Sequence, residues 1–79
     1  MVLLIMVENK SRKYLSKLSV PERTVLARHL GVTAKYLYHI ATSRRNPSRE
    51  MTIRLELITE KKVKAYDFDR EERERQRSI

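Results

Sequence analysis

Residues 23–42 read RTVLARHLGVTAKYLYHIAT, and this stretch decides the fold. Gly31, the only glycine among the 79 residues, stands where a helix has to stop in the left-handed conformation that other residues enter at a cost. The apolar side chains around it recur at spacings that point two helices inward: Leu26, Leu30, Val32, Leu37 and Ile40. The pattern predicts a helix–turn–helix, a unit that places its second helix in the major groove of DNA.

The first turns of the second helix carry the side chains that would reach the bases, counted from Thr33 as its cap. Lys35 can donate to guanine O6 and N7, Ala34 can touch a thymine methyl, and His39 can donate or accept at a purine edge. Tyr38 fits either the rim of the core or a contact with a phosphate or a base. The predicted base-reading set is therefore Ala34, Lys35, Tyr38 and His39.

Phosphate contacts are expected from side chains at both ends of this helix pair. Arg23 opens the first helix, where the backbone amides and the positive end of the helix dipole already suit a phosphate. Basic and polar residues also cluster just past the second helix. The predicted DNA-backbone set is Arg23, Thr33, Thr42, Arg44, Arg45, Asn46, Ser48 and Arg49.

The net charge of +8 is unevenly distributed along the chain. Residues 9–49 contain ten Lys and Arg and one acid, a net of +9, whereas residues 50–79 contain eight basic and eight acidic residues. A charge spread for general solubility would not be confined to one segment. The positive potential coincides with the predicted helix–turn–helix, which indicates a nucleic-acid partner and strongly salt-dependent binding.

A helix over residues 10–18 is predicted before this pair, capped by Asn9 or Ser11. We expect Tyr14, Leu15 and Leu18 to face the core and the basic side chains to take the other sides: Lys10, Arg12, Lys13 and Lys17. Ser19 and Glu22 then have the S-x-x-E spacing of a capping box, which predicts the start of the next helix.

Residues 48–58 fit two structures. Ser48 can cap a helix that has Glu50 in its first turn, but residues 51–57 also alternate between apolar and polar, as a half-buried strand would. The cap and the early glutamate favour the helix. On that helix Ile53 and Leu57 form a second apolar ridge, which is either buried under the C-terminal segment or part of a homodimer interface.

Two terminal segments flank residues 9–69, which we assign to one helix–turn–helix DNA-binding domain. Residues 1–8 are an apolar extension, too short to span a membrane and not preceded by the cationic stretch of a signal peptide. We expect the extension to pack on the domain or on a partner, and the protein to be cytoplasmic. Residues 70–79 begin REERERQR, without an apolar side chain, and are predicted to be a charged, mobile tail that buries nothing.

The sequence contains little that would support catalysis or a metal. Cysteine is absent, so disulfides and thiolate metal sites are excluded, and the two histidines lie ten positions apart. No Ser-His-Asp set, pocket carboxylate pair or glycine-rich phosphate loop can be assembled. We therefore expect no enzyme, no cofactor and no metal.

Residues 14–69 resemble the small phage and prophage helix–turn–helix regulators of the lambda-type Cro and repressor group, in particular its YdaS-like, antitoxin-like branch. The matching motifs are Tyr14-Leu15, Leu26-Ala27-x-x-Leu30-Gly31-Val32-Thr33, Tyr36-Leu37-x-x-Ile40-Ala41, Arg44-Arg45-Asn46-Pro47-Ser48 and Ile53-Arg54-Leu55-Glu56, followed by Thr59 and Val63. The resemblance implies an all-α, lambda repressor-like domain of four or five helices. Such domains bind a palindromic operator as a homodimer, repress transcription, and use the positions of Ala34, Lys35 and His39 for bases.

Three alternatives stay open at this point. Glu60-Lys61 stands where relatives tend to have a glycine pair, which leaves the end of the helix over residues 48–58 uncertain. Some Cro proteins are α+β with a C-terminal β-hairpin, and the alternation in residues 51–57 allows that fold. An antitoxin-like module would use Ile53, Leu57 and the tail to hold a partner protein while binding its own promoter. A basic domain that binds DNA or RNA without sequence preference is the third.

Overall fold

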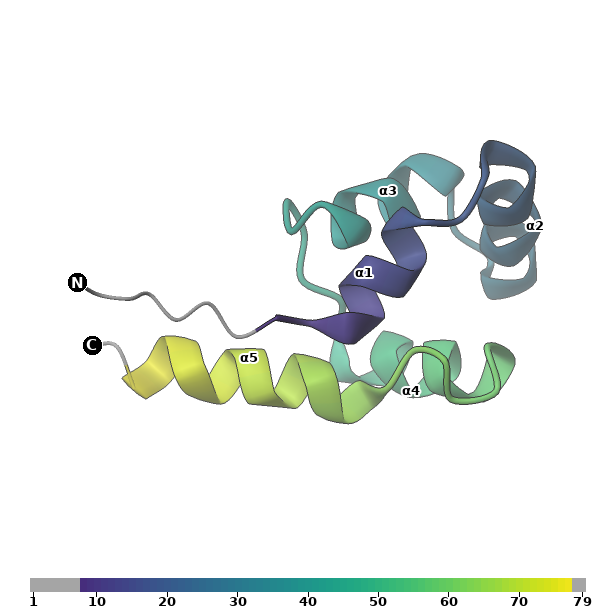
Figure 1. The fold of residues 1–79 in the computed structure, drawn as a ribbon. Helices are drawn as coiled ribbons and strands as arrows, with labels where there is room; N and C mark the ends of the chain where they lie inside the picture. The colour runs from purple at the N-terminus through teal and green to yellow at the C-terminus, as the bar shows by residue number, and fades with distance from the viewer. Residues whose placement is uncertain (1–7, 78–79) are drawn as a thin grey trace.

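Residues 8–77 form five helices and no strand in the computed structural model, which describes this part of the chain. In chain order they are α1 (Lys10–Ser16), α2 (Val20–Leu30), α3 (Ala34–Ala41), α4 (Arg49–Ile58) and α5 (Ala65–Arg77) (Figure 1). The prediction of a small all-α helix–turn–helix domain is confirmed. The β-hairpin alternative is wrong for residues 51–57, because they lie within α4.

Side-chain caps begin four of the helices as the sequence predicted. Asn9 caps α1, Ser19 caps α2, Thr33 caps α3 and Ser48 caps α4, each accepting from the amide three residues on at 3.0 to 3.2 Å. The Glu22 carboxylate completes the capping box by accepting from the Ser19 amide at 2.8 Å. Each such cap stabilises its helix by about 1 kcal/mol. Asn9, rather than the alternative Ser11, starts α1, which ends two residues earlier than predicted.

Gly31 ends α2 in the left-handed conformation, with φ 73° and ψ 28°. The amide of Val32 donates to the carbonyl of Ala27 at 3.0 Å, and the amide of Gly31 donates to that of Arg28 at 3.2 Å. These bonds satisfy carbonyls at the end of α2 and aim the chain into α3. A Cβ on Gly31 would meet no atom within 4 Å, so glycine is favoured here by its backbone angles and not by lack of space.

Two other helix ends make similar turns without glycine. Ser43 follows α3 with φ 65°, and Glu60 and Lys61 follow α4 with φ 55° and 69°. The Lys61 amide donates to the carbonyl of Glu56 at 2.8 Å, the same arrangement that closes α2. The end of α4, left open by the missing glycine pair, is thus formed by two ordinary residues in a costly conformation.

The core lies where α1, α2 and α3 meet above α4 and α5. Its buried apolar side chains come from all five helices and the loop before α5: Leu15, Ala27, Leu30, Leu37, Ile40, Met51, Leu55, Val63 and Phe68. In Figure 1, α1 lies between α3 on one side and α5 on the other, and it contacts both. Burial of each larger side chain contributes about 1.5–3 kcal/mol. This packing fixes α3 with one side inward and the other free.

Buried polar groups join the starts of α1 and α5. Ser11 is fully buried, and its hydroxyl donates to the Asp67 carboxylate at 2.6 Å while accepting from the Lys64 amide at 2.7 Å. The carboxylate of Glu56 accepts from the amide of Ala65 at 2.9 Å and so caps α5 from α4. These bonds set the angle at which α5 leaves the domain.

The apolar ridge on α4 stays exposed. Ile53 is 44% and Leu57 is 74% exposed, so the alternative in which the C-terminal segment buries this ridge is wrong. The alternative of a homodimer interface stays a prediction. Arg54, between Ile53 and Leu57 on the helix, donates to the carbonyl of Leu30 at 3.0 Å and ties α4 to the end of α2. The predicted apolar extension lies outside the described residues except for Glu8, whose carboxylate pairs with Lys13 at 3.0 Å.

Candidate nucleic-acid interface

The outer side of α3 presents the predicted base-reading residues together. Lys35 and Tyr38 are exposed, and Ala34 and His39 are half-buried at the edge of the same side. The Tyr38 and His39 rings are neighbours, with centroids 6.3 Å apart. The helix can present this side because Leu37 and Ile40 on its inner side are almost fully buried.

Arg23 of α2 reaches across to α3. Its Nη2 donates to the carbonyl of Leu18 at 3.1 Å, and its guanidinium stacks over the Tyr38 ring at 5.3 Å. This cation–π contact joins α2 to the Tyr38 side chain, which is 43% exposed. The Nε of Arg23 is buried without a partner. A phosphate contact from Arg23 would therefore use a guanidinium already fixed in place by Leu18 and α3.

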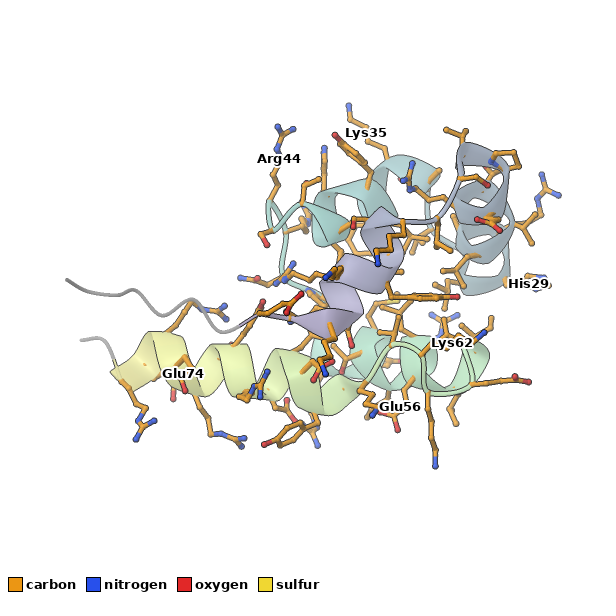
Figure 2. The ribbon with its side chains drawn as sticks, viewed as in Figure 1. His29, Lys35, Arg44, Glu56, Lys62 and Glu74 are labelled. Atoms are coloured by element: carbon orange, nitrogen blue, oxygen red, sulfur yellow. The ribbon has the colours of Figure 1, made fainter. Side chains whose placement is uncertain are left out.

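Lys35 and Arg44 point away from the body of the molecule on the same side, the side of α3 that is opposite α5 (Figure 2). Glu56 and Lys62 lie near α4 on the other side, and His29 lies at the edge, at the end of α2. Because Lys35 comes from α3 and Arg44 from the loop that follows, helix and loop present positive charge in one direction. A duplex approaching α3 would meet both.

The loop of residues 43–48, which we call the basic loop, keeps its two arginines on the surface. Arg44 and Arg45 are both exposed, and the Arg45 guanidinium lies over the Tyr36 ring at 5.6 Å. The Asn46 side-chain carbonyl accepts from Arg12 at 2.9 Å, so Asn46 supports the loop from within. The arginines remain on the surface, where phosphates could reach them.

The three predicted hydroxyl contacts are not equivalent. Thr33 and Ser48 use their oxygens as acceptors in helix caps, which leaves each hydroxyl hydrogen able to point at a phosphate. Thr42 instead donates its hydrogen to the carbonyl of Tyr38 at 3.0 Å. A phosphate accepts hydrogen bonds and does not donate them, so the geometry favours Thr33 and Ser48 over Thr42.

Arg49 at the start of α4 is paired with Asp69 of α5 at 3.2 Å. The arginine is 73% and the aspartate 40% exposed. Exposed pairs of this kind contribute between nothing and about 1 kcal/mol. The pairing therefore reduces the charge that Arg49 offers but does not prevent it from turning to a phosphate.

Arg12 occupies a position that its sequence pattern did not predict. The pattern of α1 puts it on the solvent side, and this prediction is wrong, because Arg12 is only 5% exposed. Its Nε and Nη2 donate to the two carboxylate oxygens of Glu71 at 2.8 and 2.7 Å. Nη1 donates to the carbonyls of Ile40 and, at 3.1 Å, Arg45. Nη2 also donates to the side-chain carbonyl of Asn46. Every N–H group of the guanidinium therefore has an acceptor, and this allows the charge to be buried.

The partner of Arg12 belongs to the segment predicted to be a tail. Residues 70–77 continue α5 without a break, and Glu71 is only 21% exposed. The prediction that this segment buries nothing is thus wrong at Glu71, although Glu72, Arg73 and Arg75 are exposed as expected. No local pattern could reveal the contact, since Arg12 and Glu71 are 59 positions apart.

Glu71 is held in its charged form. Burial alone would raise the pKa of its carboxyl, but hydrogen bonds from Arg12 and Asn9 and the charges of Arg12 and Arg75 outweigh that effect and lower the pKa below its ordinary value. The Glu71 carboxyl beside Arg12 is therefore charged at neutral pH.

An apolar groove of about 450 Å³ lies between α1, α2 and the end of α4. Its lining includes Leu18, Val25, His29 and Ile58. A shallower hollow that shares His29 and Ile58 continues from it to Leu57. The two hollows therefore extend as far as Leu57 of the α4 ridge, and they are lined by different residues than the base-reading side of α3.

Residues 8–77 contain no cluster of three or more histidine, cysteine, aspartate or glutamate side chains that could hold a metal ion. None of the helices in this part of the chain has the length and apolar character needed to cross a bilayer. Comparison with protein-family models, with curated proteins and with solved structures finds no match to this chain.

Proposed function

We propose that this protein is a sequence-specific, double-stranded DNA-binding transcriptional regulator that inserts α3 into the major groove. The supporting observation is that Lys35, Tyr38 and His39 lie together on the outer side of α3, beside an exposed basic loop. A helix held by its inner side and carrying donors on its outer side is what base readout requires. The resemblance to phage and prophage repressors adds repression as the expected outcome of binding.

The contacts divide into two kinds. Ala34, Lys35, Tyr38 and His39 would read base edges. The backbone contacts would come from side chains that surround the ends of α3: Arg23, Thr33, Arg44, Arg45, Ser48 and Arg49. Phosphate contacts fix the register of the protein on the duplex, and base contacts give the preference for one sequence. No cofactor, metal or catalytic group takes part in this proposal, and binding would take place in the cytoplasm.

Two copies are expected on each binding site. One α3 covers only a few base pairs, and a pair of subunits related by a two-fold axis doubles the sequence that is read. The exposed ridge of Ile53 and Leu57 is the candidate contact between the subunits. The operator would then be palindromic, with half-sites separated by about one helical turn.

Selection of bound duplexes from a random pool tests the proposal. At physiological ionic strength, the recovered sequences should share one motif, present as two inverted half-sites. Binding should weaken steeply with added salt, while the preference for the motif over random duplex persists. A folded protein, verified by circular dichroism, that enriches no sequence would contradict the proposal.

A second candidate function is an antitoxin-like module that also holds a partner protein. The observation that favours it is the apolar groove beside α4 together with the hollow that reaches Leu57, which is 74% exposed. In that case purified protein would form a stoichiometric complex with a partner encoded next to it, and the complex would bind the promoter of both genes. A protein that binds its operator fully when purified alone, and forms no such complex, favours the simple regulator.

A further inference from the structure

The guanidinium of Arg12 bridges two parts of the molecule, α5 and the end of α3 with the basic loop. One edge, made of Nε and Nη2, meets the carboxylate of Glu71 on α5. The remaining N–H groups face the end of α3 and the basic loop, through the carbonyls of Ile40 and Arg45 and the side chain of Asn46. A guanidinium is planar and rigid, so fixing one edge fixes the direction of the other.

The basic loop needs this support, because its own conformation is costly. Ser43 adopts φ 65°, a left-handed angle that favours glycine. The amides of Arg44 and Arg45 both donate to the carbonyl of His39, at 2.8 and 3.2 Å. The loop residues Ser43 to Asn46 are all exposed. Arg12 is a buried side chain that ties the loop to the rest of the domain, through the carbonyl of Arg45 and the side chain of Asn46.

We propose that Glu71 is a positioning residue of the DNA interface: through Arg12 it holds the basic loop so that Arg44 and Arg45 meet phosphates. This inference rests on the proposed function, and it makes α5 part of the DNA-binding machinery although α5 would not touch DNA. Without the carboxylate, Arg12 would be a buried charge lacking its counter-ion. The guanidinium would then turn toward water and release the carbonyl of Arg45 and the side chain of Asn46.

Simple electrostatics predicts the opposite result, which makes the inference testable. Removing an acidic side chain raises the positive charge of a DNA-binding protein and should tighten its hold on phosphates. If Glu71 positions the loop, Glu71→Gln should instead weaken binding. Glu72 offers a matched control, because it is the next residue on α5 and bonds only within that helix, to Arg75 and Gln76 at 2.7 and 3.3 Å.

The experiment compares Glu71→Gln and Glu72→Gln with the unchanged protein on the duplex recovered by selection and on a random-sequence duplex. Glu71→Gln should bind both duplexes about three- to tenfold more weakly, and the slope of log K against log salt should fall by about one unit for each phosphate that the loop no longer neutralises. Glu72→Gln should bind as tightly as the unchanged protein or more tightly, with the full slope. Amide resonances of Arg44, Arg45 and Asn46 should move in Glu71→Gln and stay in place in Glu72→Gln.

Thermal melting separates positioning from loss of the fold. If Glu71→Gln unfolds at the assay temperature, Glu71→Asp takes its place, because it keeps the charge while its shorter side chain cannot reach both Nε and Nη2 of Arg12. The inference is overturned if the folded variant binds as Glu72→Gln does with an unchanged salt slope. A failure of the unchanged protein to bind any duplex would instead overturn the proposed function, and this inference with it.

Discussion

Lys35 and His39 are the side chains that distinguish base readout from attraction to phosphate. Lys35→Ala and His39→Ala should each cost about 1–3 kcal/mol of binding free energy on the best site and relax the preference at one base pair, because each removes a hydrogen bond to a base edge. Titration of each variant against the best site and its single-base variants measures both effects. An equal weakening on every sequence would show that α3 does not read bases.

Arg45 should behave differently, because it lies in the basic loop and not on the outer side of α3. We expect Arg45→Ala to weaken binding to all duplexes alike and to lower the salt slope by about one unit, since one phosphate fewer is neutralised. The measurement is the same titration repeated over a series of salt concentrations. A weakening confined to one operator would instead assign Arg45 to base readout.

Backbone strain after α4 gives a prediction about stability. Lys61 adopts φ 69°, where a side chain costs about 1–2 kcal/mol, so Lys61→Gly should stabilise the domain by about 0.5–1 kcal/mol after the entropy gained by the unfolded chain is subtracted. Urea unfolding measures the difference.

Gly31→Val should lower the free energy of unfolding by about 1–3 kcal/mol, because it places a β-branched side chain at a residue whose φ is 73°. Urea unfolding measures this difference as well.

Lys62→Gly is the control for Lys61→Gly, because Lys62 is the next residue and does not have a positive φ. There glycine adds only flexibility to the unfolded chain and should lower the free energy of unfolding. If Lys61→Gly lowers stability by as much as Lys62→Gly does, strain at Lys61 is not a cost that the native state carries.

Among the helices, the starts of α1 to α4 were predictable, and the start of α5 and the long-range partners were not. Ser19, Thr33 and Ser48 lie within three residues of the amides they cap, so short spacings in the sequence suffice to find them. The contact of Arg12 with Glu71 joins α1 to α5 across most of the chain. Residues 10–17 carry basic side chains on several sides of the helix, and the sequence does not indicate which of these side chains will be buried.

The pair of Arg12 and Glu71 should make stability depend on pH. The pKa of Glu71 is lowered in the folded protein, so its contribution is fully present above the unfolded pKa of about 4.3 and disappears as the pH falls through the lower folded pKa. Glu71→Gln should be less stable than the unchanged protein at neutral pH, and this difference should shrink in acid. Urea unfolding at a series of pH values from about 7 to about 3 measures it.

Glu72→Gln is again the matched variant, since that carboxylate accepts from Arg75 and Gln76 of its own helix and not from Arg12. Its unfolding free energy should follow the pH dependence of the unchanged protein. A difference between Glu71→Gln and the unchanged protein that stays constant down to acid pH would mean that the ion pair is not what Glu71 contributes.

Over the whole molecule, the sequence pointed to the side that we propose binds DNA, but it did not reveal the Arg12–Glu71 contact inside the domain. Charge and motif both pointed to α3 and the basic loop, where Lys35 and Arg44 project in one direction (Figure 2). The exposed ridge on α4 was ambiguous, because apolar spacing alone cannot tell a buried side from an interface. Its exposure in the folded chain removes burial under α5 as an explanation and leaves a subunit or partner contact to be tested.

Subunit pairing on DNA is the prediction that belongs to the whole molecule. The double variant Ile53→Gln/Leu57→Gln removes the apolar ridge without adding charge, and since both side chains are exposed it should change the free energy of unfolding by less than about 0.5 kcal/mol for each substitution. Tyr66→Gln is the control, because Tyr66 is a 57% exposed aromatic residue on α5. Analytical ultracentrifugation with the selected duplex should find two copies of the control and one copy of the double variant at equal concentrations.

A duplex with a single half-site separates a defect in pairing from a defect in DNA binding. If the ridge joins the subunits, the double variant should bind this duplex as tightly as the unchanged protein, and show reduced affinity only where two half-sites are present. The affinity falls because a subunit bound at one half-site no longer contacts the second subunit and no longer helps it to bind the neighbouring half-site. Two copies of the double variant bound with unchanged affinity would place the subunit contact elsewhere and leave the α4 ridge to a different protein partner.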